Sequence, residues 1–315
     1  MKNLARRVVF SLATFIALAV VSFVGVDALP GDGCTALLGR FGTDAKIDAC
    51  RKENNLNDSV VVRLKDWSGD LVRGDLGYSI KRDEQVSEII IPRLRNTAVM
   101  AAVAALIAFP SAIVVGLLLG RYPRKRISKA VNQFSVIAMT LPEFVIATVL
   151  WLVLSIWIPI FPGVSVMPSN ASLLQLLPNV WLPALTLAVV IFAHSMRTMR
   201  ASVTNVQNMP FVESARLRGT NERKMIKRHI VPAALPPVVN VVALDGAWLL
   251  TGTFVTEAAF NFQGLGRLAI DAISDRDTAL ILPIILFGLA VYLVSSILAD
   301  SLVRVFDPRL RLSNR

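Results

Sequence analysis

The sequence predicts an all-α membrane protein of about six transmembrane helices. Hydrophobic residues make up 54% of the 315 positions and charged residues only 17%. The mean hydropathy of +0.60 is far above what a soluble protein of this size needs. Six apolar stretches are each long enough to cross about 30 Å of hydrocarbon, which takes roughly 20 helical residues.

The six stretches differ in how plainly they indicate a span. The first follows Lys2, Arg6 and Arg7, as in secretory signal peptides, but it lacks a convincing cleavage site before Pro30, so we expect a retained helix. The second contains Pro110, which a membrane helix tolerates where neighbouring helices cover the freed backbone. The predicted spans run from about Val8 to Val26, Thr97 to Gly120, Val131 to Ile158, Trp181 to Met196, Ala233 to Thr256 and Leu280 to Val303.

The positions of Lys and Arg predict which side of the membrane each loop faces. With the N-terminus inside, the cytoplasmic segments are residues 1–7, 121–130, 197–231 and 304–315, which hold 20 of the 33 basic residues. Residues 27–96 hold 11 basic and 12 acidic residues and are predicted to lie outside. Both chain ends are therefore expected in the cytoplasm.

These boundaries divide the chain into three parts. Residues 1–29 form an N-terminal segment with the first span, residues 30–96 an extracytoplasmic loop, and residues 97–315 a five-helix core that includes the cytoplasmic loop 197–231. The extracytoplasmic loop is too long for a turn and too charged to insert. We expect it to fold over the outer mouth, where it either helps to receive a partner or acts as a protective lid.

The cysteines and the charge limit the chemistry of the chain. Cys34 and Cys50 both fall in the outside loop, where a disulfide can form, and the bond would contribute about 3 kcal/mol; two free or buried thiols are the alternative. Only two histidines occur, and no His, Cys or carboxylate cluster has the spacing of a metal site. The net charge of +11 does not indicate nucleic-acid binding, because the basic residues fall between apolar runs.

The sequence contains no motif of a nucleotide motor or a hydrolase. A P-loop is excluded because no Gly-Lys pair occurs. Gly264-Leu265-Gly266-Arg267-Leu268-Ala269 matches a loose dinucleotide pattern, but no strand precedes it. The nucleophile elbow G-x-S-x-G is also missing. We therefore predict a transport subunit without a cofactor of its own, and no enzyme.

The cytoplasmic loop 197–231 is the most informative stretch of the sequence. Pro210 is placed to begin a short helix, Gly219 allows a left-handed turn, and Thr220 or Asn221 can cap a second helix that leads to Pro232. A basic loop on anionic lipid headgroups explains the charges equally well. It does not explain a small residue and a glycine at fixed offsets.

These residues closely resemble the EAA loop of binding-protein-dependent ABC importer permeases. The matching residues are Glu213-Ser214-Ala215, Gly219 and His229-Ile230-Val231-Pro232, with Ser214 and His229 as mild departures from the usual motif. Other fragments are similar to the dipeptide, oligopeptide and nickel branch of that family. They are Leu29-Pro30-Gly31-Asp32, Gly74-Asp75-Leu76-Gly77-Tyr78-Ser79, Leu182-Pro183-Ala184-Leu185-Thr186, Gly264-Leu265-Gly266-Arg267 and Asp307-Pro308-Arg309.

The resemblance implies a type I ABC importer permease fold in a bacterial inner membrane. It also implies a complex with a second related permease, two ATPase subunits that bind ATP and magnesium, and an extracytoplasmic solute-binding protein. The loop 197–231 would hold the helix that couples to the ATPase, through Glu213, Ala215 and Gly219. Arg216, Arg218 and Arg223 are further candidates for contact with an acidic ATPase surface; the alternative is that they are solvated or face lipid.

Two acidic residues near the fifth predicted span are candidates for the translocation path. A charge at membrane depth costs about 2.5 to 3.5 kcal/mol, so it usually faces an interior or a cavity. We expect Asp245, near the middle of the span, and Glu257, near its outer end, to line the path. A hydrogen bond that Asp245 accepts from a hydroxyl or amide on a neighbouring helix is an equally good interpretation.

Substrate and mechanism class are less constrained by the sequence. The branch resembled handles di- and oligopeptides, nickel chelates, opines, glutathione and some saccharides, and peptides are our preferred interpretation. The alternative function, a secondary transporter, ordinarily needs more helices or an internal repeat with ion ligands. A membrane-embedded enzyme needs a catalytic cluster. Neither alternative requires the Glu213 to Pro232 segment.

Overall fold

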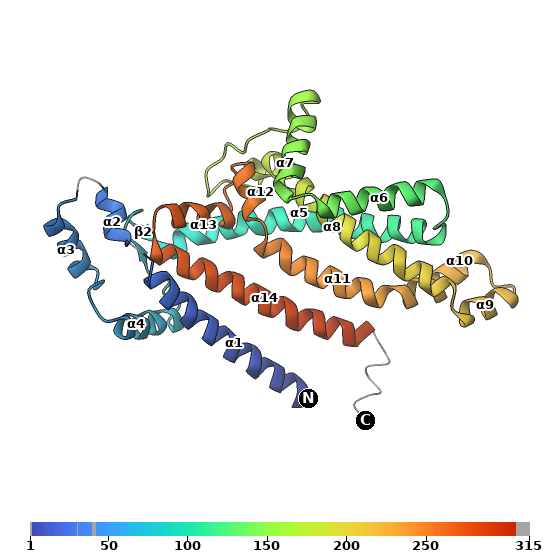
Figure 1. Cartoon of the computed structure of the whole chain (residues 1–315), viewed down its shortest axis with the longest axis horizontal. Helices are drawn as coiled ribbons and strands as arrows, with labels where there is room; N and C mark the ends of the chain where they lie inside the picture. Colours follow the sequence, from blue (N-terminus) through green and yellow to red (C-terminus); the bar gives the residue numbers. More distant parts are fainter. Residues whose placement is uncertain (1, 30, 40–41, 307–315) are drawn as a thin grey trace.

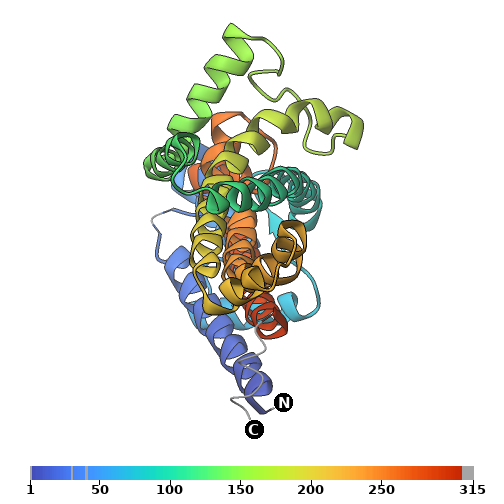
Figure 2. The same cartoon turned by 90° about the vertical axis from the view of Figure 1, so that its right-hand side faces the viewer.

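Long helices lying lengthwise along the molecule make up most of the structure (Figure 1). The computed structural model describes residues 2–29, 31–39 and 42–306. Within these residues, five helices are long and apolar enough to cross a membrane. They belong to α1 (Lys2–Asp27), α5 (Val86–Arg121), α8 (Leu173–Gln207), α11 (Val231–Thr251) and α14 (Thr278–Phe306). Viewed along the long axis, these helices gather into one bundle (Figure 2).

The predicted span from Val131 to Ile158 is wrong as a single straight helix. The chain forms α6 (Arg126–Thr140) and then α7 (Glu143–Trp151), which continues into the π-helix η2 (Leu152–Trp157). The two halves meet at an angle of 112° and count as a sixth span only if they are taken together. The break falls at Leu141 and Pro142, because a proline disfavours helical backbone at the residue before it.

The predicted fourth span, from Trp181 to Met196, is part of a longer helix. α8 starts at Leu173, where Ser172 and Gln175 form a capping box, and it continues beyond Met196 to Gln207. Met199, Val203 and Val206 keep one face of this extension buried. Residues 197–207 of the predicted loop 197–231 are thus helical. An amphipathic helix can extend beyond the apolar span when one of its faces packs against the rest of the protein.

α5 and α8 pack closely along most of their length. The residues of α5 that face α8 are small and recur every four positions. At Gly116 an added Cβ atom would lie 2.7 Å from the carbonyl oxygen of Met196, and at Gly120 it would lie 2.7 Å from that of Arg200. Small side chains allow such close approach between membrane helices. The buried stripe consists of Ala104, Ala108, Ala112, Gly116 and Gly120.

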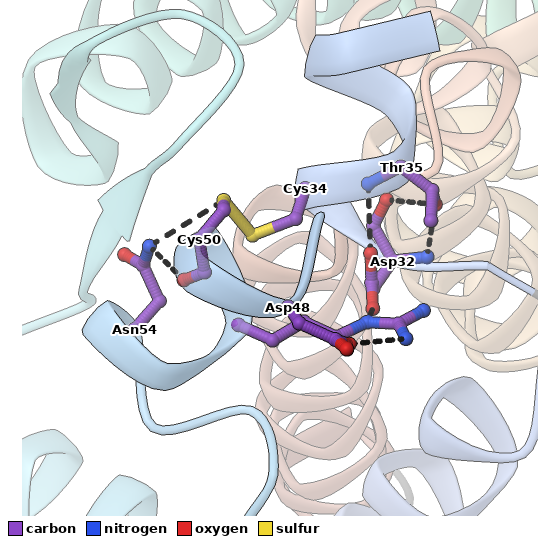
Figure 3. Close-up of a disulfide and its surroundings, with 7 residues drawn as sticks. Asp32, Cys34, Thr35, Asp48, Cys50 and Asn54 are labelled. Carbon is purple, nitrogen blue, oxygen red and sulfur yellow. Dashed lines mark hydrogen bonds and ion pairs between the residues drawn. A yellow bond between two sulfur atoms is a disulfide. The ribbon is translucent and has the colours of Figure 1, made fainter. Parts of the chain in front are cut away.

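The described parts of the loop that was predicted to lie outside the membrane form several short elements. They are α2 (Gly33–Leu38), α3 (Asp44–Glu53), α4 (Val60–Val72) and a hairpin of β1 (Tyr78–Ser79) with β2 (Glu84–Gln85). A disulfide between Cys34 and Cys50 joins α2 to α3, with Cα atoms 5.9 Å apart (Figure 3). We refer to residues 31–39 and 42–85 together as the cap.

Asp32 strengthens the same junction between α2 and α3. Its carboxylate accepts a hydrogen bond from the backbone N–H of Thr35 at 2.8 Å and one from Nε of Arg51 at 2.6 Å. Burial raises the pKa of Asp32, but these hydrogen bonds and the charge of Arg51 outweigh burial and hold the pKa below its ordinary value of 3.8. Asp32 is therefore a stable anion that caps α2.

The cap is fixed to the end of the bundle that lies farthest from α9 (Figure 1). The predicted fifth span ends early, at Thr251, and is followed by α12 (Phe254–Ala259) and α13 (Leu265–Ser274). Lys81 of the hairpin pairs with Asp275 at 2.5 Å, and Ser79 donates to the buried Asp277. An apolar cluster that includes Val86, Leu268 and Leu280 lies below these contacts.

Candidate coupling site

A short helix lies at the end of the molecule opposite the cap (Figure 1). This helix, α9 (Pro210–Leu217), begins at Pro210 as predicted, with Met209 extended and Pro210 at the first helical position. Proline suits that position because its missing N–H would have no partner there. The two-turn helix predicted after Pro210 is therefore present.

Gly219 ends α9 in a Schellman turn. Its φ of +72° is left-handed, the N–H of Gly219 donates to the carbonyl of Arg216 at 3.0 Å, and the N–H of Thr220 donates to the carbonyl of Ala215 at 3.2 Å. Asn221 then caps α10 (Glu222–Met225) by accepting from the N–H of Arg223 at 3.0 Å. A glycine is needed because other residues pay a steric penalty at this φ.

The two faces of α9 have different surroundings. Val212 and Ala215 are buried, and Val212 packs against Val206, Met225 and Ile230. Ala215 therefore fits α9 against its own chain instead of presenting a contact to a partner. The predicted coupling residues that are exposed are Glu213, Arg216, Arg218 and Gly219, and Arg223 is exposed on α10.

Two apolar side chains on the exposed face of α9 were missed by the sequence analysis. Leu217 is 83% exposed and Phe211 is 41% exposed. Exposed large apolar side chains next to charged ones are typical of protein contact surfaces. The signal was available, because Phe211 and Leu217 both fall within the short helix predicted after Pro210.

The basic segment between α5 and α6 lies beside the coupling elements. Arg121 at the end of α5 forms an ion pair with Glu222 of α10. The carbonyl of Gly120 accepts from Nε2 of Gln207 at 2.9 Å, which ties α5 to the end of α8. Lys125 lies 4.3 Å from the centroid of the Tyr122 ring. These contacts join α10 to the end of α5, and the end of α5 to the end of α8.

The second predicted helix continues into the membrane without a break. After α10 the chain forms the π-helix η3 (Ile226–Ile230) and then α11. Pro232 near the start of α11 has no N–H to donate, and a π-turn before it is a common local adjustment. The coupling segment is thus held at one end by α8 and at the other by α11.

Asp245 is engaged with the neighbouring helix α8. Nδ1 of His194 donates to one carboxylate oxygen at 2.8 Å, and Oγ of Ser195 donates to the other at 3.0 Å. The bond to Ser195 is the hydroxyl contact considered as the alternative from sequence. His194 itself lines a groove of about 600 Å³ together with Arg197 and Asn205. A role of Asp245 in the path stays a prediction.

Glu257 is fully buried and is surrounded by donors from three elements. Its carboxylate accepts from Oγ1 of Thr97 at 2.7 Å, from Oγ1 of Thr253 at 3.0 Å and from the N–H of Arg267 at 3.0 Å. In this arrangement it caps the start of α13, where a negative charge is favoured. A path role for Glu257 stays a prediction, and the structure offers it no exposed surface.

The chain matches one family model and many known permeases. Residues 112–312, more than half of the chain, match the family described as binding-protein-dependent transport system inner membrane component. The oligopeptide transport system permease protein AppB of Bacillus subtilis is 29% identical over 97% of this chain and 98% of its own length. A protein of Brucella ovis named as a peptide permease is 30% identical over 98% of both chains.

Solved structures support the same fold. The chain is similar to a chain of the MetNI methionine ABC transporter in an inward-facing conformation, with a TM-score of 0.55 and 17% identity. The match covers 70% of this chain and 96% of that one. Together with the sequence matches, these findings favour the importer over the secondary transporter. The chain therefore belongs to the binding-protein-dependent transport system inner membrane component family and is the membrane-spanning permease of an ABC importer.

Proposed function

We propose that α9 is the helix through which this permease couples to an ATPase subunit. The observation that supports this proposal is the exposed face of α9, on which Phe211 and Leu217 are flanked by Glu213 and Arg218. Apolar anchors within a charged rim suit a groove on a partner protein. Family membership implies that such partners, an ATPase and a binding protein, exist.

The mechanical link from α9 to the membrane supports the same proposal. α8 is one continuous helix of 35 residues, about 52 Å long at 1.5 Å per residue. It runs from the outer part of the bundle to the segment that precedes α9, and α5 is packed against it. A displacement of α9 by an ATPase would therefore tilt α8 and α5 together.

We further propose that the complex contains a second related permease, two ATPases that bind ATP and magnesium, and an extracytoplasmic binding protein that delivers peptides. The names of the relatives in Bacillus subtilis and Brucella ovis support peptides as cargo. Both chain ends are proposed to be cytoplasmic. The distribution of Lys and Arg supports this orientation, as does the position of the start of α1 and the end of α14 toward the α9 side (Figure 1).

Co-purification tests the coupling proposal. The chain is isolated from its native membrane through a tag, and the bound proteins are identified by mass spectrometry, for the wild type and for Gly219→Asp and Leu217→Ser. We expect the wild type to retain ATPase subunits and each variant to recover at least about tenfold less of them. Gly219→Asp distorts the turn, and Leu217→Ser removes an exposed anchor. Uptake of labelled di- and oligopeptides into the same cells should fall in parallel.

Gly74→Asp is the matched control for the turn. Gly74 has a positive φ of 83°, and, like Gly219, it has open space around its Cβ position, but it lies in the cap. The Gly74→Asp variant should therefore recover as much ATPase as the wild type. ATPases retained by both coupling variants would contradict docking through α9. If the wild type recovers ATPases normally but takes up no peptides, only the proposal that peptides are the cargo is contradicted.

A further inference from the structure

A groove of about 600 Å³ lies between α8, α11 and the end of α6. Its polar lining comes from α8, where His194, Arg197 and Asn205 recur at helical spacing along one side. α11 contributes Ala233 and Pro237. No acidic residue among those that the structure describes lines this groove. The groove therefore offers hydrogen-bond donors and a positive charge, with no carboxylate in its lining.

The polar lining reaches the middle of the membrane. Oγ1 of Thr204 donates to the carbonyl of Gly120 at 3.2 Å, so Thr204 lies level with the end of the second predicted span that is nearest α9. His194 precedes Thr204 by ten residues of α8, which is about 15 Å along a helix. Since the hydrocarbon core is about 30 Å thick, His194 lies near its centre. Arg197 lies about 10 Å inside the same surface.

His194 stays open to the groove although it is bonded to Asp245. The side chain of His194 is 44% exposed, whereas that of Asp245 is 13% exposed and has both carboxylate oxygens engaged by α8. A partly exposed imidazole at the centre of a bilayer is unfavourable against acyl chains. Ionisable side chains at this depth face a bundle interior or a water-filled cavity and mark substrate pathways. The groove therefore lines a polar space in the assembled transporter.

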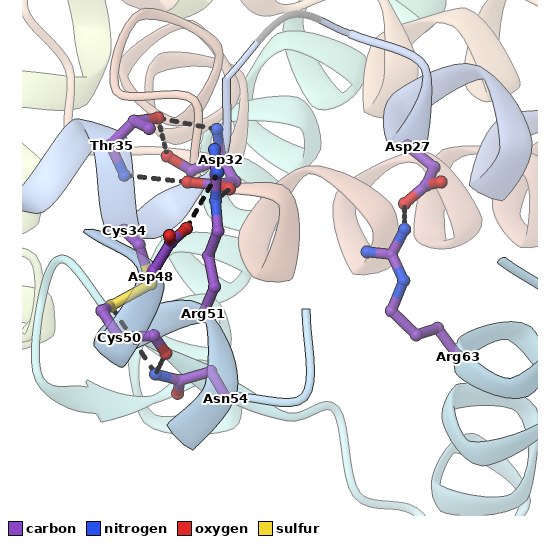
Figure 4. A network of polar contacts seen from close by, with 9 residues as sticks. All are labelled: Asp27, Asp32, Cys34, Thr35, Asp48, Cys50, Arg51, Asn54 and Arg63. Atoms are coloured by element: carbon purple, nitrogen blue, oxygen red, sulfur yellow. Dashed lines mark hydrogen bonds and ion pairs between the residues drawn. A yellow bond between two sulfur atoms is a disulfide. The ribbon is translucent and has the colours of Figure 1, made fainter. Parts of the chain in front are cut away.

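Arg197 carries the charge that this space meets. It is exposed and forms no ion pair with any residue that the structure describes. Arginines of the cap are paired, as Figure 4 shows for Arg51 with Asp32 and for Arg63 with Asp27. An arginine that is left unpaired below the membrane surface, beside a polar space, is available to an anionic ligand.

We propose that the groove is part of the translocation path and that Arg197 binds the C-terminal carboxylate of a peptide in transit. This inference rests on the peptide cargo proposed above. Every unmodified peptide carries that carboxylate whatever its sequence, and a planar guanidinium donates two parallel N–H bonds to it. The N-terminal ammonium finds no free carboxylate here, because Asp245 is engaged by His194 and Ser195. The path thus recognises the carboxyl end of its cargo and accepts varied side chains.

A thiol placed in the groove tests the proposal without the binding protein. Ala201 is exposed, lines the groove and lies one helical turn from Arg197. The two cysteines of the chain, Cys34 and Cys50, form the disulfide, so Ala201→Cys adds the one thiol of this chain that a maleimide can label. The purified transporter complex is treated with a maleimide in the presence of trialanine or trialanine amide. Labelling of this chain is followed by mass spectrometry.

We expect trialanine to slow the labelling, and the amide, which lacks the carboxylate, to need about tenfold higher concentration for the same protection. Arg197→Gln should raise the concentration of trialanine needed about tenfold and leave that of the amide unchanged. Arg126→Gln is the matched control, because Arg126 is exposed at the start of α6 and does not line the groove. Protection by both peptides should be the same with Arg126→Gln as without it.

Equal protection by the two peptides, or protection by neither, overturns the proposal. This comparison keeps Arg197 in place, so it decides even if Arg197→Gln does not assemble. Loss of the second permease from an otherwise folded Arg197→Gln complex also overturns it, because Arg197 would then contact that subunit. Uptake separates this inference from the cargo proposal. Wild-type cells that take up no peptide contradict the cargo, whereas uptake of trialanine together with equal protection by both peptides contradicts only the carboxylate site.

Discussion

The carboxylate of Glu257 holds three parts of the bundle together at the end nearest the cap. Its donors come from α5, from the residue before α12, and from the first turn of α13. Gly264 makes this possible, because a Cβ atom there would lie 2.4 Å from the carboxylate. The Gly264 to Arg267 fragment, noted in the sequence for its resemblance, thus allows a buried anion to reach a helix start.

Replacing Glu257 by alanine should destabilise the permease. Two hydroxyls and a backbone N–H would lose their acceptor in a site that water does not reach, which we expect to lower the free energy of unfolding by about 3 kcal/mol or more. The measurement is the thermal unfolding midpoint of the purified protein in detergent, with the yield of monodisperse protein as a second readout.

Glu88→Ala is the control for Glu257→Ala, because Glu88 is an exposed carboxylate on α5. Its unfolding midpoint should differ little from that of the wild type, since exposed changes usually stay within about 0.5 kcal/mol. A Glu257→Ala protein with normal stability, and with altered transport of cationic peptides only, would contradict the capping role and favour the path role.

At the scale of elements, α5 and α8 act as one rigid pair. Their contact depends on a stripe of small residues, so each backbone lies directly against the other without intervening side chains. The pair also carries polar ties at the end nearest α9, where Gln207 and Thr204 donate to the carbonyl of Gly120. This explains how a short helix outside the membrane is connected to helices that cross it.

Gly116→Ala should therefore destabilise the pair, although alanine is the better helix former. The added methyl group would lie 2.7 Å from the carbonyl oxygen of Met196, and overpacking of this kind typically costs about 1 to 3 kcal/mol. Gly25→Ala in α1, which has open space, should raise stability slightly through helix propensity. Thermal unfolding of both variants is the test; equal shifts would contradict a close α5–α8 contact.

At the scale of the whole molecule, the cap and the coupling site occupy opposite ends of the bundle (Figure 1). The cap has few apolar contacts of its own: no residue of α3 or α4 is buried. Its order depends on the disulfide, on Asp32 with Arg51, and on its contacts with the bundle. The bundle has its own apolar clusters and does not depend on the cap in the same way.

The double variant Cys34→Ser, Cys50→Ser should thus loosen the cap and spare the bundle. Removing a cross-link between residues 16 positions apart is expected to cost about 3 kcal/mol of cap stability. Limited proteolysis from the outer side should cut residues 42–85 faster in the variant, while ATPase co-purification stays unchanged. Loss of the ATPases together with the cap would show that the two ends are more strongly linked than the packing indicates.

Much of this architecture follows from local sequence. Apolar runs of sufficient length predict the spans. Pro210 and Gly219 predict the start and the turn of the coupling segment, and either Thr220 or Asn221 its cap, because each acts through its own backbone or its nearest neighbours. The matched family confirms the permease fold and function that the motif order implied.

Only the tertiary structure decided which face of each element is buried and what each charge contacts. The spacing of the motif could not tell that Ala215 points inward while Leu217 points out, nor that Asp245 meets His194 and Ser195. The 112° bend after Thr140 and the extension of α8 were equally hidden. The physical reason is that burial and polar pairing depend on which helices pack together, and hydropathy along one chain does not specify their partners.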